Sequence, residues 1–441
     1  MGQRNRVELV GMANCALPAA RSADILVRKA TRTSRDVLGP TGGQECPRSC
    51  PKQFVRVALL VAVMTVITMD ETLSVAEAAS APAATTASAP ATDLNDRLEA
   101  LRSQHKLPAL AAAVIKGQTT VALGAVGVRK DGGSERVTVE DKFHIGSCTK
   151  SMTATLAAML VEEGKLKWTT KIADVFPECA AAMHADYRDV TQEQLLSHRG
   201  GAPASLDEDG LWGRIWKHRG TPTEQRLFLL DGVVTKPPVA TPGTKYIYSN
   251  AGYAIAGAML ERITGKPWEE LVRERLFKPL GMSSAGFGTP ATAGKVDQPW
   301  GHTAGLMSLK PVPPGPGGDN PVAIGPAGTV HCSIGDLAKY AAFHLQGARG
   351  EGQLLKADSF KKLHTPIAGQ EYALGWLVVQ RGWADGTTLT HAGSNTMFYT
   401  VIWIAPKKDF AVVVATNLGG DKAEKGCDET AWMLIQEFLL K

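Results

Sequence analysis

Four Ser-x-x-Lys tetrads in this 441-residue chain could each bring a hydroxyl and an amine together. A serine hydroxyl becomes a useful nucleophile only when a neighbouring group takes its proton. Residues i and i+3 of a helix lie on one face, so a tetrad that opens a helix lets the amine reach the hydroxyl. That arrangement would serve acyl transfer. The tetrads are Ser49/Lys52, Ser103/Lys106, Ser147/Lys150 and Ser359/Lys362.

The context of the tetrads favours Ser147 and Lys150. The first tetrad lies in a basic segment before a hydrophobic run, the second runs into a proline, and the fourth falls in a short charged stretch that a proline closes. Only the third begins an amphipathic helix, because apolar residues follow it at helical spacing. Those residues are Met152, Leu156, Met159 and Leu160.

Other catalytic patterns are missing from the sequence. It contains no G-x-S-x-G elbow, no H-E-x-x-H, no P-loop G-K-[ST] and no C-x-x-C. We therefore expect no metal and no cofactor. Cys148, inside the tetrad, is interpreted as a small buried residue at the helix start.

Composition predicts a globular protein that does not bind nucleic acid. The chain is 44% hydrophobic and 21% charged, with a formal net charge of +5. Residues 1–78 carry ten Lys/Arg and seven Asp/Glu, which leaves a charge of only +2 for the remainder. No basic patch for nucleic acid is implied.

The N-terminal part is typical of an exported protein. The apolar run VALLVAVMTVITM at 57–69 follows basic residues and precedes a small-residue stretch, which predicts a signal peptide at 54–78. An uncleaved anchor is the alternative, although the run is short for a bilayer. Residues 1–53 are hypothesised to be a non-native or disordered extension, and 79–92 an Ala/Pro/Thr linker before a domain at 93–441. The protein is thus expected to be periplasmic or extracellular, with no stable membrane span after cleavage.

Both ends of this domain predict strands. After a helix at 93–104, two apolar runs flank Lys116-Gly117-Gln118 as a hairpin, and TLTHAG, FYTVIWIA and FAVVVATN predict three C-terminal strands. A last helix is predicted from Thr430. Residues 145–370 are mostly helix and loop, including a helix from Asn250 that stops at Gly265 and a long Pro/Gly loop at 310–328. The predicted fold is α+β: an antiparallel sheet from both chain ends, flanked by helices, with an inserted helical region.

Three spaced motifs carry a family resemblance: Ser147-x-x-Lys150, Tyr248-Ser-Asn250 and His391-Ala-Gly393-Ser394. In this order the chain resembles the serine β-lactamase and penicillin-binding-protein superfamily, particularly class C β-lactamases, DD-peptidases and related esterases. The resemblance covers about residues 94–440 and includes LLSHRGG, TPGTKYIYSNAGYAIAG and GPAGTVHCSIGDLAKYAAFHL.

The resemblance implies a role for each motif. Ser147 would be acylated, Lys150 would share the proton, and Tyr248 would act as partner base and return a proton to the leaving group. Asn250 would bind a substrate amide or orient Lys150. The backbone N–H groups of Ser147 and Ser394 would form the oxyanion hole. Gly393 and His391 would be further substrate-binding residues of the third motif.

His391 departs from the β-lactamase pattern, which has lysine at that position. The H-x-G form is similar to DD-peptidase-like, D-aminopeptidase-like and some esterase members, so β-lactamase activity is not favoured as the physiological role. If His391 bound a substrate carboxylate, turnover should fall as it deprotonates. The expected activity is hydrolysis of a small ester, amide or peptide through an acyl-enzyme. The alternative is a non-catalytic or slowly acylating binding or sensor protein on the same fold.

Overall fold

The computed structural model describes residues 91–305 and 308–441. The predicted extension, signal peptide and nearly all of the linker lie outside the described residues, so these assignments stay predictions. The strands are β1 Thr92–Asp93, β2 Ala109–Lys116, β3 Thr119–Gly127, β4 Lys142–His144, β5 Gly286–Phe287, β6 Gly301–Ala304, β7 Leu309–Val312, β8 Val330–Ser333, β9 Leu377–Arg381, β10 Gly386–Ser394, β11 Tyr399–Ala405 and β12 Phe410–Thr416. The α-helices are α2 Asn95–His105, α3 Thr149–Glu162, α4 Ile172–Val175, α5 Ala185–Arg188, α6 Gln192–Leu196, α7 Leu211–Lys217, α8 Pro222–Val234, α9 Asn250–Thr264, α10 Trp268–Val272, α11 Gly325–Gly328, α12 Ile334–Ala348, α13 Ala357–Leu363 and α14 Asp421–Ile435.

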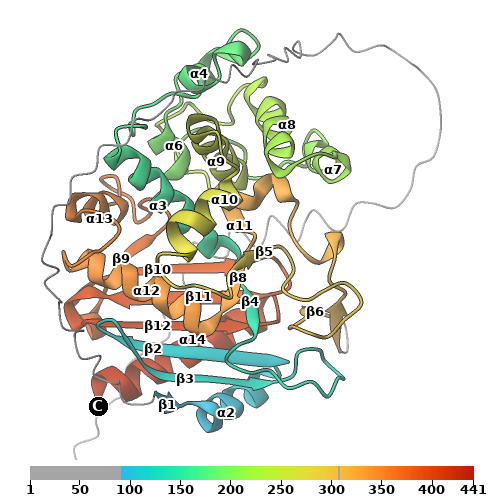
Figure 1. The fold of residues 1–441 in the computed structure, drawn as a ribbon, viewed down its shortest axis with the longest axis vertical. Coiled ribbons are helices and arrows are strands. Elements are labelled where there is room, and N and C mark those ends of the chain that lie inside the picture. The colour runs from blue at the N-terminus through green and yellow to red at the C-terminus, as the bar shows by residue number, and fades with distance from the viewer. Residues whose placement is uncertain (1–90, 306–307) are drawn as a thin grey trace, which may run out of the picture. The chain divides into compact units, whose positions relative to one another are not determined.

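Strands from both ends of the chain form one seven-stranded sheet in the order β1-β3-β2-β12-β11-β10-β9 (Figure 1). The predicted hairpin of β2 and β3 and the predicted strands β10, β11 and β12 are confirmed. Neighbouring strands are antiparallel except β1, which runs parallel to β3. The edge strand β9 was not predicted, because its half-exposed residues give no clear alternation.

The two faces of the sheet pack against different helices. In β2, Ala111, Ala113 and Ile115 join the core that includes α12 and the helical region, whereas Leu110 and Val114 pack with α2 and α14. This alternation follows from the two-residue period of a strand. It explains why β2 and β12 are continuous apolar runs, since both of their faces are covered.

Two predicted boundaries were wrong. Helix α14 starts at Asp421 rather than Thr430, because its first buried positions are the small residues Ala423, Gly426 and Cys427, which give a weak apolar signal. The segment 310–328 is not one loop. It contains most of β7, which pairs with β6, and the short helix α11.

Along the chain the helical region lies between the two groups of strands, as expected. In space α6, α8 and α9 lie beyond the β9 and β10 side of the sheet (Figure 1). Helix α9 begins at Asn250, where the Ser249 hydroxyl accepts the Gly252 N–H at 3.1 Å, and it ends at Gly265 with φ of 70°. Among the described residues, none of the helices has the length and apolar character needed to cross a membrane. Cys148, Cys332 and Cys427 are buried free thiols.

A buried ion cluster joins three of these helices. Arg226 of α8 donates to Glu261 of α9 at 2.6 Å and to Glu269 of α10 at 2.8 Å, and its other terminal nitrogen donates to the Val322 carbonyl at 3.2 Å. Arg226 is fully buried, and the glutamates hold its pKa above the usual value despite that burial. The cluster therefore anchors the segment that leads into α11.

Replacing Arg226 with alanine should destabilise the fold strongly. The substitution leaves two carboxylates inside the protein without their cation, a change that costs about 3–5 kcal/mol of unfolding free energy. Urea denaturation would measure this loss. The matched control is Arg97→Ala, which removes the partly exposed pair with Glu437 and should cost much less. Equal losses in the two variants would show that the buried cluster has no special role.

Candidate active site

The candidate nucleophile lies at the junction of the sheet and the helical region. Ser147 is the middle residue of a 3-10 turn at Gly146–Cys148, between β4 and α3. This turn packs against β10. Gly146 has φ of +49°, a conformation that favours glycine, so the backbone can turn sharply into α3 just before Ser147.

Lys150 lies within hydrogen-bond distance of three oxygen atoms. Its Nζ is 3.0 Å from Ser147 Oγ, 2.8 Å from Asn250 Oδ1 and 2.8 Å from the carbonyl oxygen of Ala327. The lysine is fully buried and also lies over the rings of Tyr248 and Tyr253. Helices α3, α9 and α11 therefore meet at one amine.

Tyr248 approaches Ser147 from the other side. Its hydroxyl donates to Ser147 Oγ at 2.7 Å. Tyr248 lies in the extended segment before α9, two residues from Asn250, so the start of one helix supplies both side chains. The structure thus brings Ser147, Lys150, Tyr248 and Asn250 together, although 100 residues separate Lys150 from Asn250.

Burial lowers the pKa of Lys150 well below its usual value of 10.5. Removal of water from an amine disfavours its charged form. A neutral amine has two hydrogens and one lone pair. The Asn250 and Ala327 oxygens can only accept, so they take the two hydrogens and leave the lone pair facing Ser147 Oγ. This is the arrangement in which lysine can remove the serine proton.

Close packing brings β10 against the nucleophile turn. A Cβ on Gly393 would lie 2.1 Å from the Ile145 carbonyl oxygen and 2.7 Å from Ser147 N, and one on Gly146 would lie 2.3 Å from Ser394 N. The segments carrying the Ser147 and Ser394 N–H groups are therefore in direct contact. Two such donors on adjoining segments can stabilise a negative oxygen that develops near Ser147.

His391 is buried on β10 and is neutral near pH 7. Burial and the nearby Lys150 lower its pKa to about 3. Its Nδ1 donates to the Ala392 carbonyl at 2.7 Å, and its Nε2 lies 3.4 Å from the Tyr372 hydroxyl. If turnover depended on protonated His391, it would already be lost far below pH 5. These surroundings therefore do not favour His391 as a charged anchor for a substrate carboxylate.

Two further residues have structural roles near the site. Burial raises the pKa of Cys148 to about 12, so its thiol stays protonated, as its interpretation as a packing residue requires. Arg199, in LLSHRGG, donates its guanidinium to the Gly243 carbonyl, and Gly243 N donates back to the Arg199 carbonyl at 2.7 Å. Arg199 therefore holds the turn that leads to Tyr248.

Sequence reasoning missed His198 and the Ala327 carbonyl. The His198 ring lies 4.4 Å from that of Tyr248, and its Nδ1 accepts the Ser249 N–H at 3.1 Å. It thus fixes the segment between Tyr248 and Asn250. The LLSHRGG motif contained this signal, whereas Ala327 contributes only backbone, which no residue type reveals.

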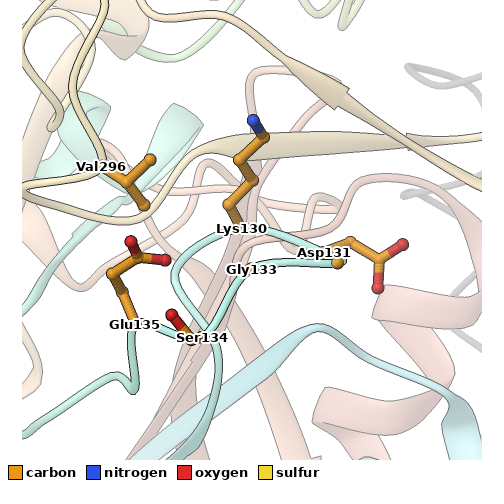
Figure 2. Close-up of a pocket in the computed structure, with 7 residues that line it drawn as sticks. Lys130, Asp131, Gly133, Ser134, Glu135 and Val296 are labelled. Carbon is orange, nitrogen blue, oxygen red and sulfur yellow. The ribbon is translucent and has the colours of Figure 1, made fainter.

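A separate surface hollow of about 500 Å³ is formed by Lys130–Glu135 and Val296. Figure 2 shows that the charged ends of Lys130, Asp131 and Glu135 point away from one another. The hollow therefore offers no convergent set of groups. Within residues 91–305 and 308–441, no three His, Cys, Asp or Glu side chains are grouped to hold a metal ion.

Gly393→Ala should abolish most reactivity at Ser147. The new Cβ would push β10 away from the nucleophile turn, and loss of one oxyanion donor typically costs about 10²–10³-fold in rate. The rate of Ser147 labelling by a fluorophosphonate measures this. Gly382→Ala is the control, since a Cβ there meets nothing within 4 Å. Normal labelling of Gly393→Ala would contradict the oxyanion assignment.

The sequence of this chain is similar to those of known proteins. Residues 94–435 match the family model described as Beta-lactamase. Penicillin-binding protein 4 of Amycolatopsis lactamdurans is 30% identical over 335 residues, covering 74% of this chain and 84% of that protein. Unguisins hydrolase ungD' of Aspergillus campestris is 28% identical over 326 residues, which are 70% of this chain but only 58% of that protein.

Solved structures share the fold. The octameric penicillin-binding protein homologue from Pyrococcus abyssi matches with a TM-score of 0.62 at 24% identity. The match covers 78% of this chain and 79% of the Pyrococcus chain. A D-stereospecific amidohydrolase from Streptomyces sp. matches with a TM-score of 0.59 at 21% identity. That match covers 76% of this chain and 97% of the Streptomyces chain. The predicted α+β fold is confirmed. On the match of residues 94–435, the chain belongs to the Beta-lactamase family, which includes the penicillin-binding-protein-like proteins.

Proposed function

We propose that the protein is an exported serine hydrolase that forms an acyl-enzyme on Ser147. The observation that carries the proposal is the partly buried contact of Ser147 Oγ with both Lys150 Nζ, at 3.0 Å, and the Tyr248 hydroxyl, at 2.7 Å. A hydroxyl between a neutral amine and a phenol has a group to take its proton and a second to deliver one.

Acylation uses these groups in order. Ser147 Oγ attacks the carbonyl carbon while its proton moves to the lone pair of Lys150, and the carbonyl oxygen, now negative, receives the N–H groups of Ser147 and Ser394. As the bond to the leaving group breaks, Tyr248 gives its proton to the leaving atom and regains one from the Lys150 ammonium. Water then hydrolyses the acyl-enzyme by the reverse transfers. Here Lys150 is the first base and Tyr248 the proton donor, a change from the order that the resemblance implied.

The substrate class is a small amide, ester or peptide with no requirement for a carboxylate at His391. The neutral, hydrogen-bonded state of His391 supports the second part. The hydrolase named among the relatives and the amidohydrolase among the structural neighbours support the first. Export rests on the apolar run at 57–69 and places the enzyme in the periplasm or outside the cell.

Intact-protein mass spectrometry after exposure to a fluorophosphonate should show one adduct, absent in Ser147→Ala. Tyr248→Phe should hydrolyse a 4-nitroanilide about 10²–10⁴-fold more slowly, because the amine leaving group needs a proton that phenylalanine cannot give. Activity should also fall at low pH as Lys150 takes up a proton, since its lowered pKa marks the acid side of the profile.

Ser359→Ala is the control for this experiment, because Ser359 belongs to another Ser-x-x-Lys tetrad far from the site in sequence. An adduct that survives in Ser147→Ala would refute the nucleophile. Failure of the wild type to react with the fluorophosphonate and with a β-lactam would instead favour the binding or sensor protein on this fold.

A further inference from the structure

We propose that Asp319 is a positioning residue for catalysis, because it ties together the two backbone segments that carry the oxyanion-binding N–H groups. This inference rests on the proposed function. Asp319 lies in the irregular segment after β7 and is 7% exposed at its side chain. Its carboxylate reaches one segment through His144 and the other through Asn395.

His144 connects Asp319 to the nucleophile turn. Its side chain is fully buried at the end of β4, and Nδ1 accepts the Gly146 N–H at 3.0 Å. Since Nδ1 accepts, the single proton of a neutral ring is on Nε2, which lies 2.7 Å from Asp319 Oδ1. The Gly146 peptide that Nδ1 holds is bonded directly to Ser147.

Asn395 connects the same carboxylate oxygen to β10. Its Nδ2 donates to Asp319 Oδ1 at 3.2 Å, and its own Oδ1 accepts the N–H groups of Met397 at 3.2 Å and Phe398 at 3.0 Å. The Asn395 side chain thus fixes the turn that follows Ser394. One oxygen atom of Asp319 is therefore shared between the residue after Ser394 and the histidine three residues before Ser147.

The loop around Asp319 also reaches the lysine. Asn320 Nδ2 donates to the Gly328 carbonyl at 2.8 Å, and the preceding carbonyl, that of Ala327, accepts from Lys150. A Cβ on Gly328 would lie 3.5 Å from the backbone of Gly146. Asp319 and Asn320 together hold the parts of the site that only backbone atoms provide.

The effect of losing Asp319 should fall on the transition state. Oxyanion donors act only on the negative oxygen that develops during the reaction, and displacements of about 1 Å can cost 10²-fold in rate. Ground-state binding of a small neutral ester does not use that charge. A merely structural role would lower stability without this selective loss of kcat.

The test is steady-state hydrolysis of 4-nitrophenyl butyrate by full-length protein, together with thermal unfolding. Asp319→Ala should lower kcat about 10–100-fold with KM within twofold, in line with outer contacts of other sites. Asp319→Asn should recover part of this loss, because its amide oxygen can still accept from Asn395 and lie against His144 Nε2. The matched controls are Asp336→Asn and Asp336→Ala. They alter a buried carboxylate that accepts hydrogen bonds from the Ser284 N–H and from Lys339 Nζ. These two variants should therefore change stability but not kcat.

A second variant keeps the proposal falsifiable if Asp319→Ala unfolds. His144→Asn retains an oxygen acceptor near the Nδ1 position for the Gly146 N–H but cannot reach Asp319, so its kcat should fall by a similar factor. Combined with Asp319→Asn it should lose less than the product of the two single effects, because both act on one linkage. Multiplicative losses, wild-type kcat in the Asp319 variants, or a change in KM alone would overturn the inference. A wild type that neither turns over the ester nor labels would overturn the proposed function and this inference together.

Discussion

The site depends on an amine held away from water. Lys150 is completely buried, and the three oxygens around its Nζ come from the nucleophile turn, the start of α9 and the backbone before Gly328. Desolvation lowers the pKa of the amine, and in its neutral form the two acceptor-only oxygens orient the lone pair. Packing of three separate helices thereby determines the protonation state of one side chain and the direction in which it can accept a proton.

A second constraint couples this amine to the sheet. β10 can approach the turn at Ser147 only because Gly393 and Gly146 have no side chain. The contact places the central sheet, a rigid element built from both chain ends, behind the candidate oxyanion hole. The carboxylate of Asp319 then connects the two sides from a loop that belongs to neither. The helical region supplies the candidate proton-transfer groups, and the sheet supplies one of the candidate backbone donors.

Local sequence was informative where the chemistry is local. The Ser147–Lys150 contact follows from helical spacing, and the α9 boundaries follow from its capping residues and Gly265. The approach of Tyr248 and Asn250 came from a family resemblance, because no local rule brings residues together across about 100 positions. The Ala327 carbonyl and the His144–Asp319–Asn395 linkage depend on backbone geometry and tertiary contacts. The strongly lowered pKa of His391 could not be predicted either, since burial rather than residue type lowers it.

The most direct test of the account is the protonation state of the Lys150 amine, followed by NMR of the Nζ and Cε signals in protein labelled at lysine. Lys150→Met assigns the resonance by its loss. The account predicts that Lys150 titrates well below 10.5. A Lys150 amine that stays charged up to about its ordinary pKa near 10.4 would contradict it, because the lone pair that the mechanism needs would then be absent.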